Sequence, residues 1–513
     1  MLIHSASKSI VLKLREPGRV LGVVPTARQF EIDGTAMVAV PHRLEETRVL
    51  RNLGFDAPSP IAHHYEWPGQ YKPFKAQAET AAFLTLNPRA FCLNGLGTGK
   101  TLATLWAFDY LRKLGEVHKM LVVSPLSTLE RTWADETFRH FPHLKVGVLH
   151  GNKERRLKLL RENFDIYVIN HDGVFTIKDQ LAERTDIDLV VIDEVASFRN
   201  ASTQRWKALH HVVKSRKWVW GLTGTPTPNE PTDAWAQVRL ISPERVNRYF
   251  GQFKAAVMEQ KGTFNWQVRE SSAKLVHDAM QPAIRFTREQ CVDLPPTLHQ
   301  TREVEMTAEQ KHAYKEMHAK LSMEFAGQQV LAANAAVKLG KLVQIACGIV
   351  YDQSGDEVLL PNKPRLDVIR EVIEQAESKV IVFVPYKSVL NNVAESLAAF
   401  TTVARISGET SKTQRDRIFS DFQTAATPRV IVASPAAMSH GLTLTAASTI
   451  IWYAPITSNE VYEQANARIV RPGQKLSTLI LNIEGSTVER KIYQRLRDKR
   501  KVQDSLLDLI AED

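Results

Sequence analysis

A glycine-rich turn near residue 100 has the residue types that bind a nucleoside triphosphate. Residues 94–101 read Asn-Gly-Leu-Gly-Thr-Gly-Lys-Thr, after an apolar run and before a helix-like stretch. Backbone N–H groups in such a turn can surround a phosphate, the lysine can reach the β- and γ-phosphates, and the final hydroxyl can bind Mg²⁺. The strict pattern has glycine at position 94, where this chain has Asn94. The residues predicted to bind the nucleotide here are Gly95, Gly97, Thr98, Gly99, Lys100 and Thr101.

Two carboxylates follow an apolar run downstream of this turn. Residues 188–194 read Asp-Leu-Val-Val-Ile-Asp-Glu, which predicts a buried strand that ends in Asp193 and Glu194. Asp193 can hold the magnesium shell through water, and Glu194 can orient or deprotonate the attacking water. Alone, the pair could be a solvated strand end. The phosphate-binding turn upstream favours the catalytic interpretation.

Two further segments have residue types that suit the same chemistry. Residues 220–226 read Trp-Gly-Leu-Thr-Gly-Thr-Pro, and small hydroxyls at such a strand end could contact the carboxylates and relay the nucleotide state. Near the C-terminus, a helix through residues 464–474 would place Gln464, Arg468 and Arg471 on one face. Two guanidiniums there could act as arginine fingers on a γ-phosphate. A surface helix with scattered arginines would give the same pattern.

The elements that must position these residues form two series. From about residue 75, helix-like segments alternate with short β-rich runs, which is typical of βαβ units and a parallel sheet. A second such series begins at residues 380–384. Asp33-Gly34 predicts a hairpin in a small unit before both. We expect an accessory unit at 1–65, a first lobe at 66–285, a second lobe at 286–485 and a C-terminal helix at 486–513.

Composition limits the classes of protein that this chain can represent. The 513 residues are 44% hydrophobic and 24% charged, which excludes a largely disordered, collagen-like or rod-shaped chain. The net charge of +10 favours a polyanionic partner, most often nucleic acid, although solubility alone could explain it. The three separated cysteines argue against disulfides and a cysteine zinc site, so we expect a reducing, cytoplasmic location. No apolar run approaches the ~18 residues of a membrane span.

The ordered set of motifs resembles the Swi/Snf-type DNA translocases of helicase superfamily two, over roughly residues 70–505. The segments that carry the resemblance are 72–77, 94–101, 121–126 with Trp133, 193–200, 222–229, 406–422, 439–444 and 464–474. The resemblance implies an α/β fold of two tandem RecA-like parallel-sheet lobes that bind ATP and Mg²⁺. It assigns Gln77 to the adenine and Gln464, Arg468 and Arg471 to the active site. The resemblance also implies a C-terminal helix that braces the first lobe.

The same resemblance implies a monomeric protein whose partner is duplex or branched DNA. Our candidates for contacts with the DNA backbone are Ser124, Ser127, Ser407 and Ser439. Two departures from the family pattern stand out. Ala196 replaces a histidine that links the carboxylates to the second lobe in relatives, so Gln464 or Thr223 is expected to do this instead. Residues 439–444 read Ser-His-Gly-Leu-Thr-Leu, which differs from the usual Gly-Leu-Gly-Leu-Asn-Leu.

These observations predict an ATP-dependent DNA translocase or helicase. It would move on, and remodel or unwind, branched DNA in replication, recombination or repair, and the small accessory content suggests a phage or bacterial setting. An RNA-directed helicase and a non-catalytic DNA-clamping protein are the alternatives. The intact Lys100, Asp193 and Glu194 argue against the second of these.

Overall fold

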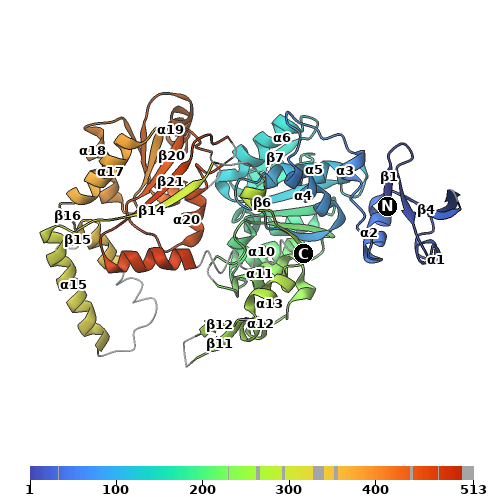
Figure 1. Cartoon of the computed structure of the whole chain (residues 1–513), viewed down its shortest axis with the longest axis horizontal. Coiled ribbons are helices and arrows are strands. Elements are labelled where there is room, and N and C mark those ends of the chain that lie inside the picture. The colour runs from blue at the N-terminus through green and yellow to red at the C-terminus, as the bar shows by residue number, and fades with distance from the viewer. Residues whose placement is uncertain are drawn as a thin grey trace. The chain divides into compact units, whose positions relative to one another are not determined.

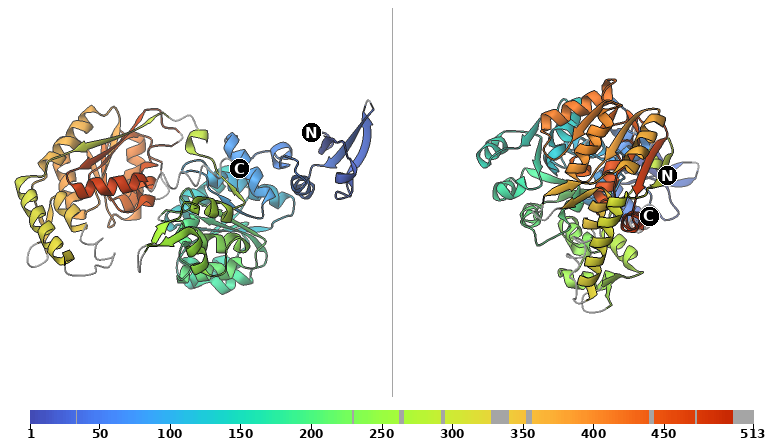
Figure 2. Two further views of the ribbon diagram at one scale, coloured as in Figure 1. Left: turned by 60° about the horizontal axis from the view of Figure 1, so that its bottom comes forward. Right: turned by 90° about the vertical axis from the view of Figure 1, so that its left-hand side faces the viewer.

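The computed structural model describes residues 1–32, 34–228, 230–261, 266–291, 295–326, 340–351, 356–438, 443–471 and 473–498. The chain divides into two compact units between Cys291 and Val292. Each unit is built on one parallel β-sheet with helices on both faces, as Figures 1 and 2 show.

The sheet of the first unit has seven parallel strands in the order β13-β5-β10-β9-β6-β8-β7. They are β5 (Arg89–Cys92), β6 (Lys119–Ser124), β7 (Val146–Leu149), β8 (Ile166–Asn170), β9 (Ile187–Asp193), β10 (Trp218–Leu222) and β13 (Ala283–Ile284). Val190 and Ile192 of β9 enter one hydrophobic core, and Leu189 and Val191 enter the other. Burial on both faces explains why these strands read as continuous apolar runs in the sequence.

The helices of this unit cover both faces of the sheet. They are α3 (Ile61–His64), α4 (Lys75–Leu86), α5 (Lys100–Lys113), α6 (Asp135–His140), α7 (Lys153–Arg161), α8 (Gly173–Thr176), α9 (Lys178–Glu183), α10 (Gln204–Val213), α11 (Asp233–Ile241), α12 (Phe250–Val257), α13 (Ser272–Ala279) and α14 (Arg288–Cys291). Short 3₁₀ turns are η1 (Leu126–Thr128), η3 (Val195–Phe198) and η4 (Pro243–Arg245), and η2 (Leu129–Ala134) is a π-helix. A hairpin of β11 (Met258–Gln260) and β12 (Trp266–Val268) follows α12 (Figure 1).

An antiparallel sheet precedes the first lobe, in the order β1-β2-β4-β3. Its elements are β1 (Leu2–His4), β2 (Ser9–Lys13), α1 (Gly18–Leu21), β3 (Arg28–Ile32), β4 (Thr35–Pro41) and α2 (Leu44–Asn52). The pairing of β3 with β4 confirms the predicted hairpin. Arg48 of α2 donates hydrogen bonds to the carbonyls of Thr85 and Leu86 at the end of α4, at 2.9 and 3.0 Å. The accessory part is therefore attached to the helix that precedes the phosphate-binding turn.

The sheet of the second unit has six parallel strands in the order β14-β21-β20-β17-β19-β18. They are β14 (Thr297–Glu303), β17 (Lys379–Phe383), β18 (Val403–Ile406), β19 (Val430–Ala433), β20 (Ala447–Trp452) and β21 (Thr478–Glu484). The other elements are α15 (Ala308–Ala326), α17 (Lys363–Gln375), α18 (Lys387–Ala398), α19 (Lys412–Thr424), α20 (Asn459–Asn466), η5 (Pro435–Met438) and the hairpin β15 (Ile349–Tyr351) with β16 (Glu357–Leu359). Alternate residues of β17 again enter separate cores. The α/β fold of two RecA-like lobes is thus confirmed.

The described part of the C-terminal helix, residues 487–498, packs on the second lobe. Tyr493 and Leu496 are buried in one of its cores. Glu489, with no exposed surface, accepts two hydrogen bonds from the guanidinium of Arg365 in α17, at 2.7 and 2.8 Å. A buried carboxylate needs such a charged partner, which fixes this stretch to the second lobe. The family resemblance implied contact with the first lobe; residues 499–513 lie outside the described part of the chain.

Candidate active site

The phosphate-binding turn joins the end of β5 to the start of α5. Gly97 and Gly99 have left-handed backbone conformations, with φ of +80° and +77°. A Cβ atom on Gly99 would lie 2.0 Å from Nε2 of Gln77. Glycine is therefore required at position 99 both by the backbone angle and by the neighbouring side chain. The predicted strand–turn–helix context of this motif is confirmed.

Lys100 lies inside the turn, with its ammonium group bound to backbone carbonyls. Nζ donates to the carbonyl oxygens of Asn94 and Gly95, at 2.8 and 3.0 Å. Burial lowers the pKa of Lys100, and the nearby carboxylates of Glu194 and Asp193 act against that shift. An ammonium group has three hydrogens, so one remains for a phosphate oxygen.

Asn94, the departure from the strict motif, has a structural explanation. Its Nδ2 donates to Oγ1 of Thr80 in α4 at 2.8 Å, and its Oδ1 accepts the backbone N–H of Phe286 at 2.9 Å. The Asn94 side chain thus connects α4 to the segment that follows β13. The Gly95 N–H donates to the Phe286 carbonyl at 2.9 Å, and the Thr98 hydroxyl donates to the Gly95 carbonyl at 2.8 Å. The Gly95 amide is therefore already committed within the protein.

Gln77 lies in the first turn of α4, against the phosphate-binding turn. Its Oε1 accepts the N–H of Phe74 at 3.0 Å, and Nε2 points to the carbonyl of Gly99 at 3.5 Å. Tyr71 and Phe74, just before the helix, are exposed aromatic residues. The proposed contact of Gln77 with adenine remains a prediction, but the structure places this side chain beside the turn.

Asp193 ends β9, and its carboxylate is held by a residue that the sequence motifs did not assign to it. Oδ2 accepts the indole N–H of Trp133 at 3.0 Å, and the backbone carbonyl accepts Nε2–H of His171 at 2.9 Å. Burial raises the pKa of Asp193, while the Trp133 hydrogen bond and the charge of Lys100 favour the ionised form. No local sequence signal could have found these partners, because they come from η2 and from the end of β8.

Glu194 has a left-handed backbone conformation, with φ of +52°, which is rare outside glycine. The hydroxyl of Thr223 donates to its Oε1 at 2.6 Å and accepts the N–H of Thr225 at 3.1 Å. The predicted contact between the polar turn after β10 and the carboxylates is therefore confirmed. Strained backbone at a site of this kind aims the side chain.

The residues present fit a magnesium ion. The Thr101 hydroxyl at the start of α5 and the Asp193 carboxylate offer the hard oxygen ligands that Mg²⁺ prefers, and this ion usually takes the rest of its shell from water and phosphate. The assignment of Thr101 and Asp193 as magnesium ligands stays a prediction.

The second lobe corrects one expectation about helix geometry. α20 ends at Asn466, so Gln464 lies on it, whereas Arg468 and Arg471 lie in the turn that follows. The residue before a proline avoids helical backbone, and Pro472 follows Arg471. Arg468 is almost completely buried, and its carbonyl accepts the N–H of Leu444. Arg471 donates through Nη1 to the Thr443 hydroxyl at 3.1 Å.

The four candidate DNA contacts fall into different surroundings. Ser124 is fully buried at the end of β6, so its hydroxyl is not on the surface. The side chain of Ser127 and all of Ser439 lie outside the described residues. Ser407 is in the turn after β18, where its Oγ accepts the N–H of Glu409 at 3.3 Å.

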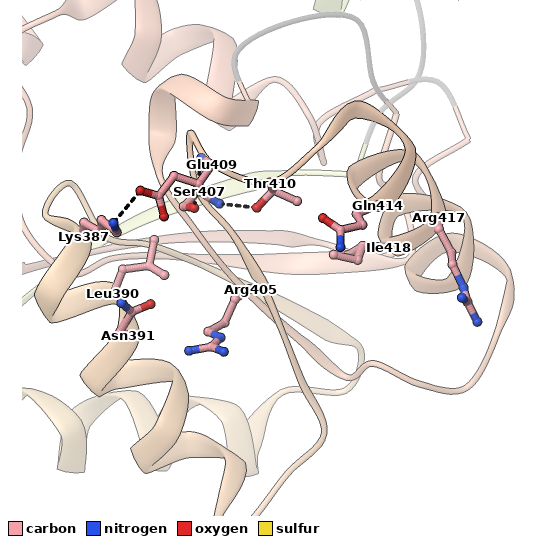
Figure 3. Close-up of a pocket in the computed structure, with 10 residues that line it drawn as sticks. All are labelled: Lys387, Leu390, Asn391, Arg405, Ser407, Glu409, Thr410, Gln414, Arg417 and Ile418. Carbon is pink, nitrogen blue, oxygen red and sulfur yellow. Dashed lines mark hydrogen bonds and ion pairs between the residues drawn. The ribbon is translucent and has the colours of Figure 1, made fainter.

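Ser407 also lines a pocket of about 590 Å³ in the second lobe (Figure 3). Lys387 of α18, Arg405 of β18 and Arg417 of α19 line it as well. Lys387 pairs with Glu409 at 2.6 Å across its rim, as the dashed line in Figure 3 marks. The lining of the pocket thus contains three basic side chains and one carboxylate.

Two RecA-like lobes, a phosphate-binding turn and paired carboxylates define an ATPase of the helicase type. Residues 93–348 match the SNF2-related domain, and residues 364–473 match the helicase conserved C-terminal domain. The chain belongs to this Swi/Snf-type family of superfamily two, and it is an ATP-using, helicase-type enzyme.

Individual relatives are distant in sequence. Protein p41 of Acyrthosiphon pisum secondary endosymbiont phage 1 is 25% identical over 439 residues, which cover 81% of this chain and 93% of that protein. The ISWI chromatin-remodeling complex ATPase ISW1 of Saccharomyces cerevisiae is 24% identical over 85% of this chain, which spans only 40% of its length. The Sulfolobus solfataricus SWI2/SNF2 ATPase core in complex with dsDNA is 24% identical, with a TM-score of 0.43, over 87% of this chain and 94% of that one.

No helix in the described parts of the chain is long and apolar enough to cross a membrane.

Proposed function

We propose that this protein is a DNA translocase that uses ATP hydrolysis to move on DNA and to remodel or unwind branched DNA in replication, recombination or repair. The observation that carries this proposal is the complete set around the phosphate-binding turn: Lys100 within the turn, Asp193 and Glu194 at the neighbouring strand end, and Thr223 bound to Glu194. A degenerate, non-catalytic clamp would have no need to keep all four.

In this proposal the first lobe binds the triphosphate and activates the water. Lys100 contacts the β- and γ-phosphates, and Thr101 and Asp193 hold magnesium, which would neutralise phosphate charge. Glu194 orients the attacking water or takes its proton, with its carboxylate aimed by Thr223. Arg468 and Arg471 act as arginine fingers when the lobes close, and Gln464 helps to sense the nucleotide.

The proposed DNA partner is supported by charge and by the basic pocket. The net charge of +10 suits a polyanion, and Lys387, Arg405 and Arg417 offer cations for the DNA backbone on the second lobe. Contacts to phosphates do not depend on sequence, which suits a protein that must move along DNA.

A panel of ATPase measurements tests this function. We expect strong stimulation of ATP hydrolysis by duplex DNA and weak stimulation by double-stranded RNA, with unwinding or remodelling of forked and four-way DNA. The Lys100→Ala protein is the control and should bind DNA without hydrolysing ATP. Stimulation by RNA alone would indicate an RNA helicase, and DNA binding with no ATPase activity in the unaltered protein would indicate a clamp.

The accessory unit at residues 1–65 provides the test for branched substrates. We propose that it contacts a DNA junction or fork. Arg48 attaches this unit to α4 by two hydrogen bonds. The ATPase activity of a protein that lacks residues 1–65 is therefore measured first on linear duplex DNA. Selective loss of activity on forked DNA supports the junction role, and equal loss on both substrates contradicts it.

A further inference from the structure

The indole of Trp133 connects two motifs that sequence analysis treats separately. Trp133 lies in the π-helix η2, in the segment that follows β6 and that resembles a DNA-contact motif. Its N–H donates to Oδ2 of Asp193 at 3.0 Å. The Trp133 side chain is fully buried, so water does not compete for this hydrogen bond. π-Helical turns are rare and are frequently found at functional sites.

The strand register explains how these two residues meet. β6 and β9 are parallel neighbours, with Val123 opposite Ile192, so Ser124 and Asp193 leave the sheet at the same edge. From β8, on the other side of β6, His171 adds a second link. Its backbone N–H donates to the Ser124 carbonyl at 3.2 Å, and its ring donates to the Asp193 carbonyl. Asp193 is therefore connected twice to this part of the chain, through its carboxylate to Trp133 and through its backbone carbonyl and His171 to Ser124.

Packing alone does not require this arrangement. A buried indole N–H usually finds an acceptor, and a backbone carbonyl is enough. In the described part of the first unit, the N–H groups of Trp106, Trp206 and Trp220 all donate to backbone carbonyls, at 2.8 to 3.0 Å. Trp133 instead donates to the ionisable side chain that is the predicted magnesium ligand.

We propose that Trp133 is a positioning residue that couples the DNA-contact segment to the nucleotide site through Asp193. Its hydrogen bond fixes one oxygen of the carboxylate and leaves other lone pairs for the magnesium shell. A displacement of η2 when DNA binds changes the orientation of Asp193, and the nucleotide-bound state of Asp193 in turn favours one position of η2. This inference rests on the proposed function, because it assumes that DNA is the partner of this segment.

Binding measurements test the coupling without relying on turnover. The dissociation constant of a duplex DNA is measured with and without magnesium and a non-hydrolysable ATP analogue, and that of the analogue with and without DNA. Coupling between two sites is reciprocal and typically changes affinity about 5- to 150-fold. We expect a factor in this range for the unaltered protein and a factor near 1 for Trp133→Phe, which removes the N–H but keeps an aromatic ring. The affinity for DNA without the analogue, and that for the analogue without DNA, should each change less than about threefold, because neither affinity contains the coupling between the two sites.

ATPase activity gives a second readout. Trp133→Phe should lower the DNA-stimulated kcat about tenfold or more, because a hydrogen bond to a charged group is lost, and should lower the rate without DNA by a smaller factor, so that the stimulation by DNA falls. Trp206→Phe is the matched control: it also removes an indole hydrogen bond of the first unit, but that bond goes to the Ala236 backbone carbonyl and not to a side chain of the nucleotide site. It should keep the full coupling.

Several outcomes would overturn the inference. Retained coupling in Trp133→Phe would do so, as would an equal loss of nucleotide affinity with and without DNA, which would make Trp133 a local support only. Should that variant not fold, hydrogen exchange of residues 126–134 is measured in the unaltered, DNA-bound protein with and without magnesium and the analogue; identical protection in the two states is equally contrary. An unaltered protein with no DNA-stimulated ATPase would contradict the proposed function itself, which separates the two failures.

Discussion

The nucleotide site of the first lobe and the basic pocket of the second lobe are built in opposite ways. In the first lobe, Asp193, Glu194 and Lys100 each have a short, shielded hydrogen bond to a neighbour that aims them. In the second lobe, Arg405 and Arg417 are largely exposed, and their ion pairs with Glu395 and Asp421 are long, at 3.7 Å. Exposed ion pairs are worth about 0–1 kcal/mol, so these arginines remain available to another anion.

This difference fits two different tasks. A group that stabilises developing charge works best when it is fixed before the reaction begins. A group that holds DNA during translocation must release it in every cycle, and weak, exposed contacts suit that requirement. Removing a fixed group should therefore cost much more than removing an exposed one, and the following substitutions test that ranking.

The largest effect is expected at Arg471, an arginine of the second lobe whose guanidinium is hydrogen-bonded within the protein. Its guanidinium donates to Thr443 and to the Ala467 carbonyl. If it is an arginine finger, Arg471→Ala should lower kcat about 10³-fold or more while ATP still binds. The control is Arg370→Ala, on the exposed face of α17. Equal turnover in both variants would show that Arg471 is an ordinary arginine.

The next largest effect concerns stability of the second lobe. Glu489→Gln leaves the buried guanidinium of Arg365 without its counter-charge and should cost about 3–5 kcal/mol of unfolding free energy, measured by urea denaturation. Glu371→Gln breaks a surface pair with Arg302, where both side chains are about half exposed (47%), and should cost about 0–1 kcal/mol. Similar losses in the two variants would remove the distinction between fixed and exposed charges.

Thr223→Val tests the fixed carboxylate of the first lobe. Valine has nearly the same shape but cannot donate to Glu194, and it leaves the Thr225 N–H without its acceptor. A lost hydrogen bond to a charged group costs about 1.5–3 kcal/mol, so kcat should fall roughly ten- to a hundredfold. Thr223→Ser restores the hydroxyl and should recover most of the rate. No difference between valine and serine would mean that Glu194 is aimed by its backbone alone.

Local and distant residues differ in how well the sequence predicts them. The phosphate-binding turn and the Asp193-Glu194 pair could be found because each is contiguous and lies at the end of an apolar strand. The partners of Asn94 could not, because Thr80 is 14 residues away and Phe286 is 192 residues away. Trp133 and Asp193 are separated by 60 residues and meet only through the sheet order.

The expected helix through Arg468 and Arg471 is absent for a different reason. Their spacing from Gln464 matches a helix face, but helical spacing does not show that a helix continues. α20 ends at Asn466, and the Leu444 N–H binds the Arg468 carbonyl instead of leaving it for another helical turn. The pre-proline position of Arg471 argues only against helical backbone at that one residue, so the earlier end at Asn466 had no such signal.

The smallest effect is expected at the exposed pocket. Arg405→Gln and Arg417→Gln should each weaken duplex binding modestly and lower the dependence of log K on log salt by about one. Arg415→Gln, on the same helix as Arg417 but bonded to the Ala437 carbonyl outside the pocket lining, is the matched control and should leave that slope unchanged. ATP hydrolysis without DNA should be the same in all three variants, because none touches the nucleotide site of the first lobe. A salt slope that is unchanged in Arg405→Gln and Arg417→Gln would mean that the pocket does not bind the DNA backbone. The exposed arginines of the second lobe would then have no DNA-binding task to set against the fixed groups of the nucleotide site.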